Sequence, residues 1–219
     1  MRAVAVARGR LAGRPWRGVS GYVTLVAAAW LLLWAIQRSE HAWLFSHEVL
    51  GARGLAPALA VAGYMSGWIL MSLAMMLPGE LPTLAGVSAN CSAWLAGYLS
   101  PWLLFGFAFG AVDLLVHVLV APVHPQLVAR APAILWGAAG VQLLVRFVGA
   151  RRRRSPRSGM KTSFARGWCE GRICLRRDWL LMLTVVGSGH GSLLVMAAAT
   201  VVMSGQAMAS VARWPQPAQ

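Results

Sequence analysis

Charged residues are scarce in this sequence. Only 12% of the 219 residues are Asp, Glu, Lys or Arg, whereas 58% are hydrophobic. A chain of this size with so few charged side chains has too little polar surface to cover a water-soluble globule. The composition therefore excludes an ordinary soluble domain and indicates a protein whose solvent is the lipid bilayer.

Cysteines and recognisable catalytic motifs are also few or missing. The three cysteines, Cys91, Cys169 and Cys174, fall on segments expected to face the cytoplasm, where thiols stay reduced. This position argues against a disulfide framework. Because the sequence contains no phosphate-binding loop, nucleophile elbow or metalloprotease helix, we do not expect an enzyme.

Long apolar runs make up most of the chain. Each of five runs is long enough to cross a hydrocarbon core of about 30 Å at about 1.5 Å per helical residue. Because the runs are continuous and do not alternate, they predict helices and not barrel strands. We expect an all-α, polytopic transmembrane helical bundle with five spans: Gly18 to Ile36, Leu55 to Leu77, Ala93 to Val120, Ala131 to Val148 and Trp179 to Met203.

Basic residues are distributed unevenly around these spans. Five arginines lie in the tail of residues 1–17, and ten basic residues lie in the loop of residues 149–178. Since cytoplasmic segments are rich in Lys and Arg, the N-terminus and this loop are predicted to be cytoplasmic, with four spans between them. Residues 18–203 then form a single transmembrane domain, and the tail of residues 204–219 faces outward.

The net charge of +14 follows from this topology and does not require nucleic acid as a partner. The expected partners are the lipid bilayer, anionic lipids at the polybasic loop and a membrane-protein partner. Anionic head groups would be attracted by roughly 1 kcal/mol per Lys or Arg near the membrane surface.

Pairs of glycines four residues apart occur in three of the predicted spans. Such pairs allow two helices to approach closely, so we expect the second, third and fifth helices to form the centre of the bundle. The pairs are Gly63 with Gly67, Gly106 with Gly110, and Gly187 with Gly191.

Asp113 and His117 are the most informative polar residues within the spans. They share one helical face with Gly106 and Gly110, so Asp113 is expected to face protein and not lipid. His190, in a Gly/Ser-rich stretch of the fifth span, should also point inward. A carboxylate within the membrane indicates an ion or metal site or a proton relay; the alternative is that these side chains only hold the helices together.

Imidazoles and thioethers extend this set of candidate ligands. His41 and His47 lie on the first outer loop, and imidazoles combined with carboxylates suit zinc, copper, iron or nickel. Met75 and Met76 in the second span carry thioethers, which bind cuprous copper, unless they serve only for packing. The predicted metal ligands are Asp113, His117, His190, His41, His47, Met75 and Met76.

One stretch of the sequence resembles a known family. The pattern Trp68-x-x-Met71-x-x-Ala74-Met75-Met76-x-Pro78 resembles the signature of the uncharacterised bacterial family of predicted metal-binding integral membrane proteins (domain of unknown function 2182). The likeness extends over roughly residues 60 to 203 and includes Cys174-x-x-x-x-Trp179 and Met182. It implies metal binding, although this chain has Arg177-Asp178 where the family typically has a cysteine pair.

The leading hypothesis is a protein of the bacterial inner (plasma) membrane that binds or handles a transition metal, with copper as the first candidate. Asp113, His117 and His190 would hold the ion. The alternative is a non-catalytic membrane subunit or scaffold of a larger membrane complex, and a third possibility is proton-coupled transport.

Overall fold

The computed structural model describes residues 15–46, 49–50, 54–80, 90–120, 122–148, 162–187 and 193–212. Within these residues the chain is helical and contains no strand, so the predicted all-α class is confirmed. The α-helices are α2 (Pro15–Gln37), α3 (Pro57–Met76), α5 (Cys91–Leu115), α6 (Pro125–Val148), α7 (Ser163–Gly187) and α8 (Leu193–Ala212). Shorter elements are the 3₁₀ turns η1 (Ala42–Phe45) and η3 (Pro78–Glu80) and the π-helical turn η4 (Val116–Val120).

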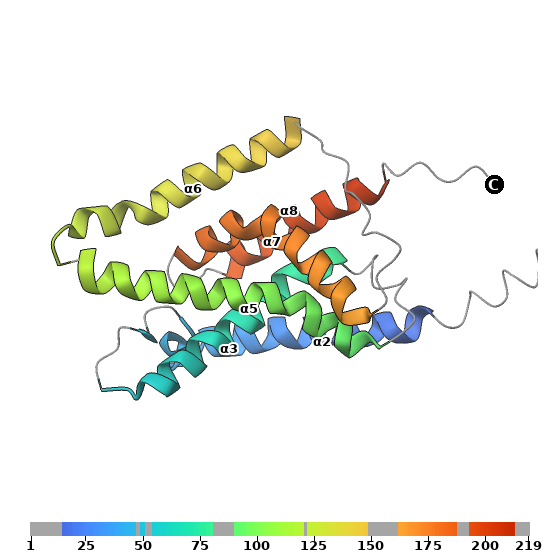
Figure 1. Ribbon diagram of the computed structural model, residues 1–219, viewed down its shortest axis with the longest axis horizontal. Helices are drawn as coiled ribbons and strands as arrows, with labels where there is room; N and C mark the ends of the chain where they lie inside the picture. The colour runs from blue at the N-terminus through green and yellow to red at the C-terminus, as the bar shows by residue number, and fades with distance from the viewer. Residues whose placement is uncertain are drawn as a thin grey trace, which may run out of the picture.

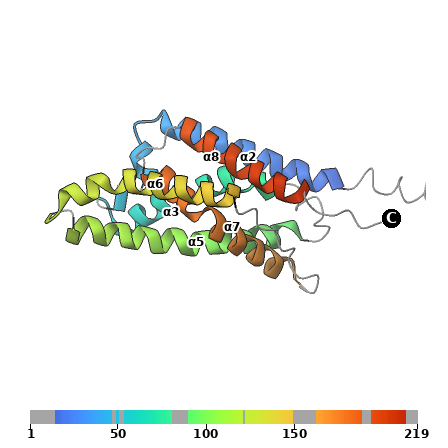
Figure 2. The same cartoon turned by 90° about the horizontal axis from the view of Figure 1, so that it is seen from above.

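Successive helices alternate in direction along the long axis of the molecule (Figure 1). α2 and α7 begin at the right-hand end of this view, and α8 ends there. The view turned by 90° shows the same arrangement (Figure 2). α8 therefore ends at the end of the bundle where α2 begins, and the side of the membrane on which residues 204–219 lie stays a prediction.

Three helices in the described ranges are long and apolar enough to cross a membrane. They are Ser20–Gln37, Pro57–Met76 and Cys91–Val120, and they coincide with the first three predicted spans. Arg130–Val145 and Leu193–Gln206 are shorter apolar helices within the predicted fourth span and at the end of the fifth. Many large apolar side chains remain exposed on α5 and η4, among them Leu104, Phe107 and Leu119, as expected for contact with lipid.

Two sequence-based boundaries differ from the structure. Residues 163–178, expected within a polybasic loop, form the first half of α7. The single span expected over residues 179–203 falls in two helices, since α7 ends at Gly187 and α8 begins at Leu193. α8 also continues to Ala212, nine residues beyond the predicted end of the span at Met203. A helix need not end where the apolar run ends. The Gly187 to Ser192 stretch has weak helix propensity, which fits an end of α7 at its first glycine.

Glycines bring α5 and α7 into close contact. A Cβ on Gly97 of α5 would overlap the Phe164 carbonyl of α7, and a Cβ on Gly167 or Gly171 would overlap the backbone of Trp94 or Tyr98. The two helix backbones are thus in direct contact, which only residues without a side chain permit. The first half of α7, which contains its arginines, is therefore packed directly on α5.

The glycine pairs predicted in the second and third spans pack against other groups. Gly63 and Gly67 of α3 lie against the carbonyls of Leu44 and Phe45, so they accommodate η1 and not another long helix. Gly106 and Gly110 of α5 lie against the rings of Trp68 and Tyr64 of α3. The Trp68 indole donates to the Trp102 carbonyl at 2.8 Å, and the Tyr64 hydroxyl donates to the Gly106 carbonyl at 2.8 Å. The second and third spans are therefore joined by aromatic side chains seated on glycines. Gly191 of the third predicted pair lies outside the described residues.

Candidate functional site

A cluster of ionisable side chains is buried where the end of α3, the turn η3, α5 and α7 meet. Glu80, Tyr98, Cys174 and Asp178 have no exposed surface, and Arg177 is only partly exposed. We refer to these five residues as the thiol–carboxylate cluster. Burial of several ionisable groups together requires that they bond to one another, so their contacts determine what the cluster can do.

Cys174 lies at the centre of this hydrogen-bond network. The Tyr98 hydroxyl lies 3.1 Å from the Cys174 sulfur and 3.4 Å from the Met76 carbonyl oxygen, so it is positioned to donate to either acceptor. The Cys174 thiol in turn donates to a carboxylate oxygen of Asp178 at 3.7 Å. Cys174 and Asp178 are four residues apart, which places both on the face of α7 directed at α5.

Arg177 supplies the positive charge of the cluster. Its Nε and one Nη lie 2.7 and 2.6 Å from the same oxygen of Asp178, and that Nη lies 3.9 Å from the Cys174 sulfur. The Gln142 side chain donates to the Arg177 carbonyl at 3.4 Å and so joins α6 to this site. Burial and the neighbouring Asp178 carboxylate raise the pKa of the Cys174 thiol, so the sulfur is protonated at neutral pH.

Three buried methionines lie on the two helices α3 and α7 that meet at this cluster. Met75 and Met76, at the last turn of α3, and Met182, two turns after Cys174 on α7, are all buried in the same apolar core. Thiolates and thioethers favour cuprous copper over hard cations such as Mg²⁺ or Ca²⁺. These sulfur atoms suit a soft metal ion, and an ion bound by the Cys174 sulfur would displace the thiol proton.

Asp113 and His117 lie at the other end of α5. A His117 nitrogen is 3.5 Å from an Asp113 carboxylate oxygen and 2.9 Å from the Asp113 carbonyl oxygen, so the two residues contact each other as predicted. The Asp113 side chain is 16% exposed, whereas that of His117 is 46% exposed. Fifteen residues of helix separate Asp113 from Tyr98, which corresponds to about 22 Å. The pair is therefore distant from Met75, Met76 and the thiol–carboxylate cluster.

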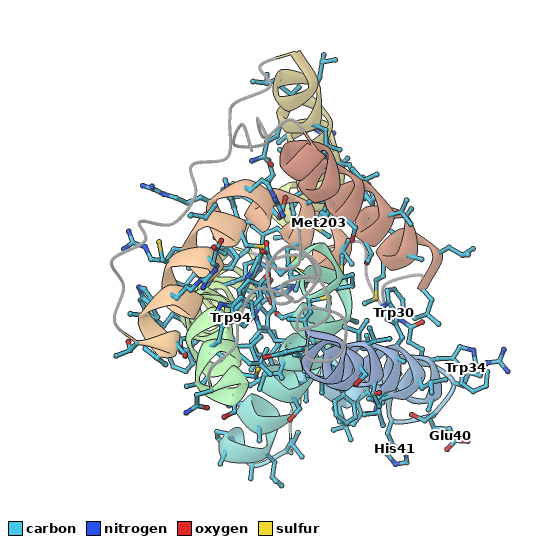
Figure 3. All side chains as sticks on the ribbon, turned by 90° about the vertical axis from the view of Figure 1, so that its right-hand side faces the viewer. Trp30, Trp34, Glu40, His41, Trp94 and Met203 are labelled. Atoms are coloured by element: carbon cyan, nitrogen blue, oxygen red, sulfur yellow. The ribbon has the colours of Figure 1, made fainter. Side chains whose placement is uncertain are left out.

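The remaining histidine ligands predicted from the sequence do not extend this pair. His41 is exposed and lies with Glu40 at the margin of the bundle, whereas Trp94 lies near its middle (Figure 3). His47 and His190 lie outside the described residues. Among the residues that the structure describes, no three His, Cys, Asp or Glu side chains converge as a metal-binding group.

Sequence reasoning did not identify the thiol–carboxylate cluster. It noted Cys174 and Arg177-Asp178, it noted Tyr98 only as part of the family resemblance, and it did not consider Glu80. A signal was available, because Glu80 and Asp178 are acidic residues directly adjoining long apolar runs, where a charge needs a partner. The sequence could not show that α5 brings Tyr98 between the two segments.

Comparison with known proteins identifies the family. No curated protein and no solved structure matches this chain. A family model described as "PpoB2: Copper chaperone" matches residues 65–218, more than two-thirds of the chain and including the entire thiol–carboxylate cluster. The match agrees with the metal-related character of the resemblance noted in the sequence, although not with that family's name. The chain therefore belongs to the PpoB2 copper chaperone family, which suggests a role related to copper.

Proposed function

We propose that this protein is an integral membrane carrier that binds cuprous copper as cargo, without catalysing a reaction. The observation that carries the proposal is the buried Cys174 thiol, which lies beside the methionine-rich end of α3 and within the region matched by the copper chaperone family. Cys174 would supply a thiolate ligand. Met75 and Met76, in the last turn of α3, would supply thioether ligands.

Tyr98 and Arg177 have a supporting role in this proposal. The Tyr98 hydroxyl donates toward the Cys174 sulfur and would stabilise negative charge on it when copper replaces the proton. The paired Arg177 acts in the same direction through its charge, 3.9 Å from the sulfur. These residues orient and polarise the thiol, while sulfur atoms would form the bonds to copper.

Copper titration of the purified protein tests this proposal. The chain is purified in detergent under reducing conditions, loaded with Cu⁺, and bound metal is measured after gel filtration. We expect bound copper in the wild type and its loss in Cys174→Ser, while Cys91→Ser, which removes another thiol of the matched region, is the control and retains it. Wild-type protein that binds no copper would refute the function.

A second set of ligands follows from the sequence. In that set Asp113 and His117 would hold a transition metal at the far end of α5, without His41, which does not extend the pair. Asp113→Ala and His117→Ala test that possibility in the same titration. We favour Cys174 because it is buried and soft, whereas the His117 side chain is nearly half exposed.

We also propose how the protein lies in the bacterial inner membrane. The N-terminus and residues 149–178 would be cytoplasmic, where the basic residues contact anionic lipids. Because α8 ends where α2 begins, the C-terminus would lie on the same side. Reporter fusions at residue 160 and after Ala212 should both report the cytoplasm; a periplasmic signal at residue 160 would reverse the orientation.

The rival function is a scaffold or subunit of a larger membrane complex. The ion pair of Arg177 with Asp178, and the bond from Gln142, join α6 and α7 in the way a purely structural network would. Affinity purification from native membranes separates the two. A stoichiometric protein partner together with a copper-free chain supports the scaffold.

A further inference from the structure

An apolar pocket lies beside η1, against the part of α3 that precedes Met75 and Met76. It has an internal volume of about 100 Å³ and lies between α2, η1 and α3, with the end of α7 and the start of α8 closing it. No charged side chain lines it among the described residues. Its most informative lining residues are Gln37, Phe45, Ser46, Trp68, Met71 and Met196.

Two thioethers from different helices line this one space. Met71 belongs to α3 and Met196 to α8, and both contribute to the wall of the pocket. Thioether sulfur is a weak ligand for hard cations, which would also lose their water without receiving oxygen ligands in return. A soft monovalent ion such as Cu⁺ is the cation that this lining suits.

An aromatic ring adds a second favourable feature for a cation. The Trp68 indole lines the pocket, and its N–H is fixed by the hydrogen bond to the Trp102 carbonyl of α5. A ring held in this way has a fixed position, and a cation that reaches the face of an indole gains about 0.5 to 2 kcal/mol, more when water is excluded. The pocket thus offers two soft donors and an indole ring without a fixed negative charge.

The position of the pocket indicates a route for an ion. Gln37, Ala42 and Ser46 are lining residues at the connection between α2 and α3, and His41 is an exposed residue of the same connection. Met71 is four residues from Met75 and therefore on the same side of α3. Met75 and Met76 then lead toward the Tyr98 hydroxyl and Cys174.

We propose that Met71 and Met196 form a second cuprous copper subsite, which exchanges the ion with the Cys174 site through the buried methionines of α3. This inference rests on the proposed copper function. It assigns the pocket a ligand class and assigns Met71 and Met196 a role as ligands. The ion would bind there by exchange of soft ligands, with no change in oxidation state and no proton released.

Titration with Cu⁺, and with Ag⁺ as a soft ion that resists oxidation, tests the subsite. The full chain in detergent is compared with Met71→Leu/Met196→Leu, with Cys174→Ser and with Met203→Leu, a buried methionine outside the pocket lining. Leucine has nearly the volume of methionine, so folding should be retained, and gel filtration and thermal unfolding check this. We expect wild type and Met203→Leu to bind a second ion that the double variant loses, and Cys174→Ser to keep that ion.

The possible results separate the subsite from the function itself. A single ion that Cys174→Ser loses and the double variant keeps would overturn the subsite and leave the proposed function intact. A wild-type chain that binds neither ion would refute both. A lipid or detergent chain held in the pocket in native mass spectra, together with only one bound ion, would also overturn the subsite. X-ray absorption of the Ag⁺ bound to Cys174→Ser should show sulfur neighbours only, and oxygen or nitrogen neighbours would contradict it.

Discussion

Replacing Gly167 with alanine is expected to force α5 and α7 apart. A methyl group at this position would lie 2.9 Å from both the Trp94 carbonyl carbon and the Tyr98 amide nitrogen, and closer still to the Trp94 carbonyl oxygen. Carbon atoms in good contact lie about 3.5 to 4.0 Å apart. These neighbours are backbone atoms of a helix and cannot rotate away, so the helices must separate by about 1 Å.

The cost of this separation can be set against the gain in helix propensity. Overpacking costs about 1 to 3 kcal/mol, while alanine gains up to about 1 kcal/mol over glycine within a helix. With the full propensity gain the net loss is up to about 2 kcal/mol, which for a chain of this size lowers Tm by up to about 8 °C. Gly137→Ala in α6 is the matched control, because no atom lies within 4 Å of its added methyl group. It should unfold at or above the wild-type temperature.

Thermal unfolding in detergent measures the loss of stability, and thiol labelling measures whether Cys174 becomes accessible. Because Gly167 contacts the backbone beside Tyr98, separation of the helices should lengthen the contact of the Tyr98 hydroxyl with Cys174. Cys174 should then react faster with a maleimide in a chain whose other cysteines are replaced by serine. If Gly167→Ala unfolds no earlier than Gly137→Ala and labels no faster, the close contact of α5 with α7 is not present.

Three further changes test the thiol–carboxylate cluster. Tyr98→Phe removes the hydroxyl that donates toward Cys174 and Met76 and should cost about 1 kcal/mol in thermal unfolding, with unchanged stability contradicting the bond. Asp178→Asn leaves the Arg177 charge without its counter-ion and should cost about 3 kcal/mol, whereas the exposed Arg176→Met control should cost little. The raised pKa of Cys174 means that Cu⁺ must displace a proton from the thiol. The apparent affinity for Cu⁺ should therefore weaken about tenfold per pH unit from pH 8 to 6. Competition with a chelator measures this affinity, and an affinity that does not depend on pH would argue against a thiolate ligand.

Particular residues show where sequence reasoning succeeded. The spacing of Gly106, Gly110, Asp113 and His117 predicted one inward face of the third span. Both glycines are buried and Asp113 is largely covered, whereas the His117 side chain is 46% exposed. The contact of Asp113 with His117 also follows from helical spacing alone. Spacing of this kind succeeds because it depends only on the geometry of a single helix.

Other residues show where reasoning from the sequence failed. Gly97, Gly167 and Gly171 were not recognised as a packing surface, although Gly167 and Gly171 are four residues apart, because the surrounding arginines suggested a loop. The glycine pair in α3 was recognised, but its neighbour proved to be η1. Spacing indicates that a helix can be approached closely, but it does not identify what approaches it.

The sequence by itself determined the helical class, the first three apolar spans and the soft or ionisable side chains available for metal binding. These depend on composition and on periodicity within one segment, which are local properties. The tertiary structure decided that α7 packs on α5, that Glu80 and Tyr98 lie with Cys174 and Asp178, and that Asp113 lies far from them. Contacts between distant segments depend on how helices stack, and the energies of many alternative pairings are too similar for a single sequence to distinguish.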